Sequence, residues 1–300
     1  MNKKSLFSGT GVALVTPFRK GQDNIDFTKL ANLINYVIDG GVNFIVALGT
    51  TSEAATMTEL EKAALRDYIV ETVAGRVPIM LGMGGNNTLA LTDAIQRTNF
   101  EGISGLLSVT PYYNKPQQRG LVQHFHMVAE VSPVPVMLYN VPGRTGCNMT
   151  AETTLQIAEE CSNVMGVKEA SGNMTQIMEI LRNKPANFQL LSGDDALTCP
   201  MIAMGATGVI SVMANALPKE MSQMVNYAMK GDLKRALPLH YKMLPLMQAI
   251  FEEGNPGGVK ALLELKEIIS NQLRLPLCKV SKTLYNKLAT LDTEFKQGGF

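Results

Sequence analysis

The segment VPVMLYNVPGRTGCNMTAETTLQIAEECSNVMGVKE, residues 134–169, has the pattern of one strand–helix–strand unit. Two short apolar runs, which begin at Val134 and Val164, flank a stretch with a helix-start signal at Thr150. Runs that are apolar on both faces and alternate with helices are typical of a parallel sheet that is covered on both sides. The segment therefore predicts two parallel strands joined by a crossover helix.

Similar apolar runs recur along most of the chain. Their starting points lie 20 to 34 residues apart, and each gap leaves room for one helix and two short loops. The runs begin near Gly11, Asn43, Val77, Ile103, Val134, Val164, Phe188 and Gly208. Eight such units without a linker predict an α/β fold, a (β/α)₈ TIM barrel. A doubly wound open sheet is the alternative, but the stretch GMGGNN at residues 82–87 lacks the third glycine of a dinucleotide-binding loop.

Local signals predict several helix boundaries. Thr58 and Glu61 form a capping-box signature, and Gly40-Gly41 predicts the end of the first helix. Asp194-Asp195 is better explained as a helix N-cap than as a metal site. After the last run the strand signals stop, and further helices are predicted at residues 217–230, 233–251, 259–271 and 280–291. We therefore expect a barrel at residues 1–231 that carries the active site, followed by a C-terminal helical appendage at residues 232–300.

Composition excludes several classes of function. The chain has 300 residues, of which 46% are hydrophobic and 18% charged, and its formal net charge is +1. Such a chain is globular, and its charge gives no reason to expect binding to nucleic acid or to an anionic membrane. The low charged fraction suggests that other subunits cover part of the surface. Four widely spaced cysteines without a CxxC pair favour a cytoplasmic location, and only three histidines are present, so no metal site is expected.

The carboxyl ends of the predicted strands carry reactive side chains, and in a TIM barrel catalytic groups lie at these ends. Lys168 closes an apolar strand. Burial can lower the pKa of an amine by up to about 3–5 units, which would make Lys168 a nucleophile for a carbonyl group. The structural alternative is a lysine that pairs with Glu169. The tyrosines and threonines at neighbouring strand ends favour the nucleophile.

Five other side chains have both a functional and a structural interpretation. Tyr139 and Tyr113 are candidate proton carriers that Thr50 would link, or they pack at strand ends. Thr50 and Thr51 can offer backbone N–H groups to a small carboxylate, or they only cap a helix. Arg144 has the planar fork that suits a carboxylate, although a lone arginine in a loop is more often a surface residue.

Four motifs together point to a family. They are GTTSE at residues 49–53, YNVP at 139–142, GVKEA at 166–170 and SGDD at 192–195. This combination resembles the pyruvate-dependent class I lyase and aldolase family, which includes dihydrodipicolinate synthases and N-acetylneuraminate lyases. The similarity runs from about residue 7 to at least residue 218. Arg144 within VPGRTG and the stretch TPYYNKP at 110–116 resemble the dihydrodipicolinate synthase branch.

The resemblance implies a reaction and a set of roles. Lys168 would form a Schiff base with pyruvate, and the enamine would attack L-aspartate 4-semialdehyde to give 4-hydroxy-tetrahydrodipicolinate, in diaminopimelate and lysine biosynthesis. No metal or organic cofactor is implied, and a homotetramer, a dimer of dimers, is expected. The implied roles are proton relay for Tyr139, Thr50 and a neighbouring subunit's Tyr113; pyruvate-carboxylate binding for Thr50 and Thr51; semialdehyde binding for Arg144; and pocket lining for Gly193 and Ile210.

Two other functions stay open from the sequence. One is an aldolase that cleaves a 2-keto-3-deoxy sugar acid or N-acetylneuraminate, against which Arg144 argues. The other is a non-catalytic barrel that senses or binds pyruvate, and the complete set of reactive residues argues against it.

The chain also departs from the family pattern. Ser52 and Ala54 stand where glycine and serine are usual, and we expect Ser52 to meet a backbone constraint that glycine normally relieves. In the lysine-inhibited members an effector binds in a cleft at the dimer interface. The residues here that match are Asn86 and Tyr112, and those that depart are Ala90, Glu59 and Lys62. A bound lysine would lose the main partner of its ammonium group, so we expect feedback inhibition by lysine to be weak or absent.

Overall fold

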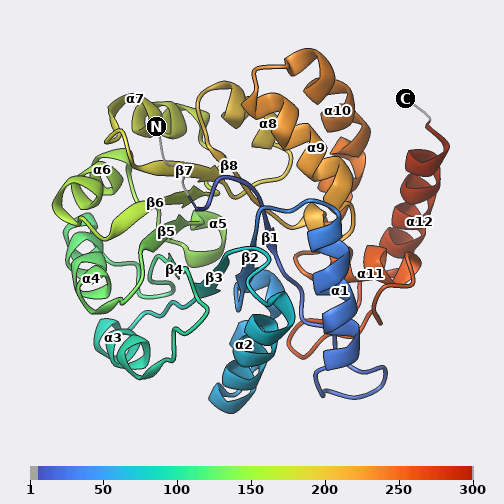
Figure 1. Cartoon of the computed structure of the whole chain (residues 1–300), viewed down its shortest axis with the longest axis horizontal. Helices are drawn as coiled ribbons and strands as arrows, with labels where there is room; N and C mark the ends of the chain where they lie inside the picture. The colour runs from blue at the N-terminus through green and yellow to red at the C-terminus, as the bar shows by residue number, and fades with distance from the viewer. Residues whose placement is uncertain (1–5, 299–300) are drawn as a thin grey trace.

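Eight parallel strands pair in chain order and close into a barrel in the computed structural model, which describes residues 6–298 (Figure 1). They are β1 (Gly9–Ala13), β2 (Phe44–Ala47), β3 (Ile79–Gly82), β4 (Gly105–Val109), β5 (Val136–Asn140), β6 (Val164–Glu169), β7 (Gln189–Ser192) and β8 (Gly208–Ser211). Because β8 also pairs with β1, the sheet has no free edge. The predicted TIM barrel is confirmed, with each strand at a predicted apolar run.

Helices surround the barrel and alternate with its strands (Figure 1). They are α1 (Phe27–Asp39), α2 (Glu59–Val73), α3 (Thr88–Arg97), α4 (Gln118–Val131), α6 (Ala151–Glu160), α7 (Met174–Asn183), α8 (Thr198–Ala203) and α9 (Pro218–Met229). Short helical turns follow three strands: η1 (Thr50–Ser52) and η2 (Ala54–Thr56) after β2, α5 (Pro142–Thr145) after β5, and η3 (Met213–Asn215) after β8. These turns are the loops that a TIM barrel uses for its active site.

Three helices follow the barrel units: α10 (Leu233–Ala249), α11 (Gly257–Leu265) and α12 (Lys282–Gln297). α10 packs against α9, and α12 packs against α10 and α11 at the periphery (Figure 1). The segment between α10 and α12 also makes buried polar contacts with the loop after β2, described below. The division of the chain at residue 231 stays a prediction.

Three of the local helix signals are confirmed and two are wrong. Gly40 is the C-cap of α1, as expected for Gly40-Gly41, and Thr150 is the N-cap of α6. Thr58 and Glu61 form the expected capping box at the start of α2. The predicted cap at Asp194-Asp195 is wrong, because α8 begins later and its N-cap is Leu197. Asp194 instead closes a turn, in which Oδ1 accepts hydrogen bonds from the amides of Ala196 and Leu197. The helix predicted at 259–271 already ends at Leu265.

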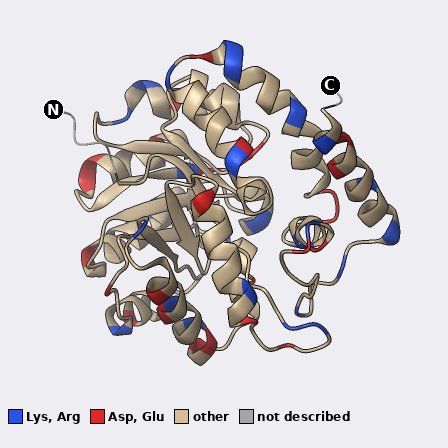
Figure 2. Cartoon of the chain, turned by 45° about the vertical axis from the view of Figure 1, so that its right-hand side comes forward, with Lys and Arg blue, Asp and Glu red and all other residues tan. Residues whose placement is uncertain are grey.

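Charged side chains are interspersed over the outer helices and loops, with both signs present on each side of the view (Figure 2). The residues of the barrel strands are nearly all uncharged, as expected for strands that are buried on both faces. Within residues 6–298 no helix is both long and apolar enough to cross a bilayer.

The closure of the barrel depends on Gly208. Its φ is +146°, and a Cβ atom there would lie 2.0 Å from the carbonyl oxygen of Gly9 on the neighbouring strand. Only glycine combines this backbone angle with such a close approach between strands.

We expect Gly208→Ala to lower the free energy of unfolding by about 3 kcal/mol or more, because the methyl group must push β1 away from β8. Gly231→Ala is the matched control, since Gly231 also has a positive φ (+73°) but no atom within 4 Å of its Cβ position. That control should lose only about 1–2 kcal/mol from backbone strain. Urea unfolding measures the free energy of unfolding of both variants. Equal losses for Gly208→Ala and Gly231→Ala would contradict the proposed importance of the close β1–β8 contact at Gly208.

Candidate active site

Lys168 and Tyr139 form the centre of the site. Lys168 lies near the end of β6 and Tyr139 near the end of β5, and they pair directly across the two strands. The Lys168 Nζ atom lies 4.1 Å from the centroid of the Tyr139 ring. Both side chains are buried, with 6% and 7% exposure. The barrel thus places an amine and a phenol together at the carboxyl ends of adjacent strands, where a carbonyl substrate would meet both.

A bulge in β6 sets this pairing. Val136 pairs with Val164, but Met137 pairs with Gly166, so β6 contains one extra residue at Met165. Beyond the bulge the register is regular up to the end of both strands. A bulge of this kind changes which side chains face each other. Here it brings Lys168 into register with Tyr139.

The next pair along the same strands, Asn140 and Glu169, locks the register. Asn140 Nδ2 donates to both carboxylate oxygens of Glu169, at 3.3 and 3.1 Å. Gln176 Nε2 and the Ser171 amide also donate to this carboxylate, at 3.2 and 2.7 Å. Both residues of the pair have 0% exposure. The structure therefore contradicts the alternative in which Lys168 forms an ion pair with Glu169. Amide groups donate to the Glu169 carboxylate instead.

Gly193, one of the two residues predicted to line the pocket, lies beside the lysine. The Gly193 amide donates to the carbonyl of Glu169 at 2.8 Å, which ties the end of β7 to the end of β6. A Cβ atom on Gly193 would lie 3.1 Å from Lys168 Cε and 2.7 Å from Ala170 Cβ. Gly193 therefore leaves the space that the lysine arm occupies. Ile210 is buried on β8, at 1% exposure.

The two threonines after β2 occupy the short helix η1. Thr51 is buried, at 3% exposure, whereas Thr50 is exposed. The first amides of a helix have no acceptor within it, so the N–H groups of Thr50 and Thr51 remain available for a small anion. The Thr51 hydroxyl accepts a hydrogen bond from Asn255 Nδ2 at 2.9 Å, a contact that the sequence did not predict.

The expected backbone constraint at Ser52 is not found. The left-handed residues in this loop are Leu48, with φ +55°, and Glu53, with φ +59°. Ser52 itself lies within η1, and its hydroxyl donates to the carbonyl of Gly49 at 2.8 Å. Serine is therefore accommodated here by a hydrogen bond to its own turn.

Glu53 ties the same loop to the C-terminal region. Its carboxylate accepts from Lys260 Nζ at 2.5 Å and from the Arg274 amide at 3.0 Å. The Glu53 and Lys260 side chains both have 0% exposure. Burial lowers the pKa of Lys260 to about 8, although the charge of Glu53 opposes this shift. No local motif marked this ion pair, since its two residues lie 207 positions apart.

Tyr113 and Arg144 lie apart from the buried Lys168–Tyr139 pair and are exposed. Tyr113 is 87% exposed, in a loop where its φ is +73°. Arg144 is exposed on α5. Within residues 6–298 no hydrogen bond connects the hydroxyls of Tyr139, Thr50 and Tyr113.

Asn86 and Tyr112, the two residues that match the effector cleft, are in contact. Asn86 Nδ2 donates to the Tyr112 carbonyl at 3.0 Å. Ala90 lies nearby, and its amide is the donor to the N-cap Asn87 of α3. The structure thus brings Asn86 and Tyr112 together, and the position at which an acid was expected in lysine-inhibited members carries the methyl group of Ala90.

Asp195 holds the loop after β8. Its Oδ2 accepts from the amides of Val212 and Met213, at 3.1 and 2.8 Å. Complete burial raises the pKa of this carboxyl from 3.8 to about 6. The hydrogen bonds from Ser211 and Met213 favour the charged form and lower the pKa, but the effect of burial is larger. The residue predicted as a helix cap is therefore a buried link between the ends of β7 and β8.

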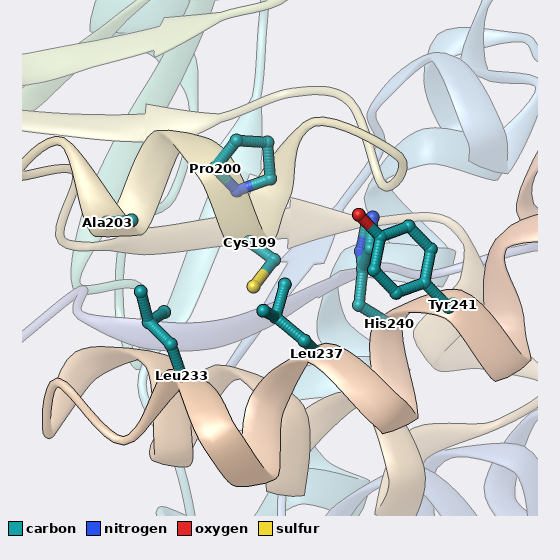
Figure 3. A pocket seen from close by; sticks show the side chains of 7 residues that line it. All are labelled: Cys199, Pro200, Ala203, Leu233, Leu237, His240 and Tyr241. Atoms are coloured by element: carbon teal, nitrogen blue, oxygen red, sulfur yellow. The ribbon is translucent and has the colours of Figure 1, made fainter.

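A separate apolar pocket of about 140 Å³ lies outside the barrel, between α8 and α10 (Figure 3). Cys199 on α8 points toward Leu237 on α10, and Pro200 and His240 also line the pocket. Burial raises the pKa of the Cys199 thiol and lowers the pKa of His240, and both shifts favour the neutral form of the side chain. Neutral groups in an apolar pocket do not make a nucleophilic site.

Comparison with known proteins agrees with this geometry. The model of the dihydrodipicolinate synthetase family matches residues 6–294. The chain belongs to this family. Among curated relatives, the 4-hydroxy-tetrahydrodipicolinate synthase of Flavobacterium psychrophilum is 49% identical over 282 residues, which cover 94% of this chain and 96% of that protein. The synthase of Phocaeicola vulgatus is 46% identical over 288 residues, covering 96% and 97%.

A solved structure shows the same fold in this family. The chloride-inhibited dihydrodipicolinate synthase from Acinetobacter baumannii, complexed with pyruvate, matches with a TM-score of 0.92 and 35% identity, over 96% of this chain and 99% of that one. The resemblance found from the four motifs is confirmed, and so is the predicted enzyme class, a lyase of this synthase family.

The pKa of Asp195 predicts how stability changes with pH. The folded protein holds this proton more tightly than the unfolded chain, so the wild type loses stability as the pH rises from about 4 to about 6. Asp195→Asn has no proton to lose. The stability of the variant relative to the wild type should therefore increase by up to about 3 kcal/mol between pH 4 and pH 7.

Thermal unfolding of both proteins across this range measures the difference. Asp232→Asn is the control, because the hydrogen bond from Arg235 lowers the pKa of Asp232. That variant should show no relative gain as the pH rises. A constant difference between Asp195→Asn and wild type would contradict the assignment.

Proposed function

We propose that Lys168 attacks pyruvate to form a Schiff base, and that the resulting enamine condenses with L-aspartate 4-semialdehyde to give 4-hydroxy-tetrahydrodipicolinate. The chain is a 4-hydroxy-tetrahydrodipicolinate synthase, a lyase of lysine biosynthesis, by its family and its full-length similarity. The observation that carries the mechanism is the Lys168–Tyr139 pair, an amine 4.1 Å from the ring of a phenol at adjacent strand ends.

The first step is carbinolamine formation followed by loss of water. The neutral Lys168 amine adds to the ketone carbon of pyruvate, and the carbonyl oxygen leaves as water after it receives two protons. Tyr139, whose ring lies beside the Lys168 amine, supplies and recovers these protons in this proposal, with Thr50 and Tyr113 as relays to solvent. Removal of a methyl proton then gives the enamine, which is the carbon nucleophile.

The two substrate carboxylates have separate partners in this proposal. The amides and hydroxyls of Thr50 and Thr51 bind the pyruvate carboxylate. Arg144, exposed on α5 directly after the strand of Tyr139, binds the carboxylate of the semialdehyde through its planar guanidinium group. Gly193 leaves the space that the lysine arm needs. After condensation the amino group of the product attacks its imine carbon, which closes the ring and releases Lys168.

We also propose a homotetramer, a dimer of dimers, in the cytoplasm. The 87% exposure of Tyr113 supports self-association, because a proton relay requires that this side chain be enclosed by a second copy. Three free cysteines, Cys147, Cys161 and Cys199, are buried as thiols, which supports a reducing compartment.

Trapping with borohydride tests the nucleophile. Incubation with pyruvate followed by reduction should add the mass of one reduced pyruvate imine, located at Lys168 by peptide mapping. Lys168→Met should abolish both the adduct and the condensation. Lys184→Met is the matched control: burial also lowers the pKa of Lys184, but it donates to the carbonyl of Phe188 and should be dispensable. An adduct elsewhere, or none in the wild type, would rule out the mechanism. Turnover of sugar acids in place of the semialdehyde would favour the aldolase alternative.

Mixed oligomers test the position of Tyr113. Tyr113→Phe should lower kcat by about 100-fold or more while Lys168 still traps pyruvate, because only the proton relay is broken. Lys168→Met is inactive but still carries Tyr113. Coexpression of the two variants should therefore restore activity, since one site of a hybrid dimer then has both residues. If Tyr113 serves its own chain, the hybrid stays inactive.

A further inference from the structure

Asn255 is a buried side chain of the C-terminal region that reaches the pyruvate-binding loop. It lies between α10 and α11, and 7% of it is exposed. Its Nδ2 atom donates to the Thr51 hydroxyl at 2.9 Å, across 204 positions of sequence. Its other amide atom, Oδ1, is buried without a hydrogen-bond partner among residues 6–298. The hydrogen bond to Thr51 is thus the one hydrogen bond that its side-chain amide makes in the described chain.

The direction of this hydrogen bond determines what Thr51 can do. A hydroxyl has one proton to donate and two lone pairs that accept, whereas the amide nitrogen of asparagine only donates. The Thr51 oxygen therefore uses a lone pair on Asn255, and its proton stays available. Within residues 6–298 the Thr51 hydroxyl has no acceptor for that proton. A carboxylate has acceptors only, so a hydroxyl held in this state is matched to pyruvate.

The same C-terminal segment anchors the loop at a second point. Lys260 on α11 pairs with Glu53, two residues after Thr51, and also donates to the carbonyl of Gln272 at 2.8 Å. Arg274 contributes its amide to Glu53 and its side chain to Glu61 on α2. The backbone around Thr51 is therefore fixed independently of Asn255. A change at Asn255 should act on the hydroxyl rather than on the whole loop.

We propose that Asn255 is a positioning residue for pyruvate: by donating to Thr51, it keeps the Thr51 proton available to the substrate carboxylate. The inference rests on the proposed role of Thr51 and adds a residue that acts through it without touching substrate. In the alternative explanation, Asn255 only supports the loop by its shape. A residue of the same shape would then keep pyruvate binding unchanged.

Aspartate separates the two explanations, because Asn255→Asp keeps the shape and reverses the polarity. The carboxylate can only accept, so Thr51 must donate to it and loses its proton for pyruvate. We expect Asn255→Asp to raise the KM for pyruvate by about 100-fold at pH 8, and Asn255→Ala, which removes the donor without a competing acceptor, by about tenfold. In both variants kcat should change less than KM, since Lys168 and Tyr139 are untouched.

The pH profile provides the second readout. A protonated aspartate has an O–H group that can donate to Thr51 as the asparagine does. The ratio of KM between Asn255→Asp and wild type should therefore fall toward one as the pH is lowered. The ratio for Asn255→Ala should stay constant. A structural defect gives no reason for recovery at acid pH.

Asn271 supplies the matched control. It lies in the same C-terminal segment, is 3% exposed, and also has a buried Oδ1 without a partner among the described residues. Asn271→Asp should lower thermal stability without changing the KM for pyruvate.

Half-saturation of borohydride trapping at Lys168 measures pyruvate binding without the second substrate. If the wild type traps pyruvate and Asn255→Asp binds pyruvate equally well, the inference is wrong. The same result is expected if the Asn255 side-chain amide is turned over, so that the Thr51 hydroxyl donates to it. Equal increases in KM for Asn255→Asp and Asn271→Asp would likewise overturn it. If the wild type itself traps no pyruvate, the proposed function fails instead.

Discussion

The pairing of β5 with β6 is the constraint on which the rest of the site depends. Successive residues of a strand point to opposite faces, so a slip of one residue would turn Lys168 away from the barrel interior. One matched pair, Lys168 and Tyr139, carries the reactive groups. The next pair, Asn140 and Glu169, hydrogen-bonds within the layer between the barrel and α7. The bulge at Met165 and the Asn140–Glu169 bond therefore fix the distance between amine and phenol without adding any group to the pocket.

Two of the buried carboxylates near the site, Glu169 and Glu53, are stabilised in different ways. A buried charge is strongly destabilising unless it is paired or hydrogen-bonded. Glu169 receives amide donors, which satisfy it while leaving Lys168 without a competing ion pair. Glu53 receives the ammonium of Lys260, which fixes a loop in which Glu53 itself has a positive φ. If Glu169 paired with Lys168, the amine would be held as an ammonium ion and would lose its nucleophilic lone pair.

The features predicted from sequence are those that depend on local pattern. Eight apolar runs at regular spacing identified the barrel, and a lysine at the end of one run stood out because such runs otherwise contain no charge. Asn255 and Lys260 escaped prediction because their partners lie more than 200 positions away, and nothing near them in sequence shows the contact. Asp195 escaped for a related reason: an acidic pair before a helix usually caps it, and only the structure shows that Asp195 binds the amides after β8.

The predicted residues and the missed residues differ in what holds them in place around the barrel. Side chains at strand ends take their positions from the pairing of the strands, and the ladder between β5 and β6 places Lys168 opposite Tyr139. Thr50 and Thr51 lie in a short turn with no ladder to support it, so their orientation depends on groups from outside the barrel unit. Residues 255–274 provide these groups through Thr51, Glu53 and Glu61. The C-terminal region is therefore joined to the loop proposed for substrate recognition, while the reactive amine and phenol rest on the strands.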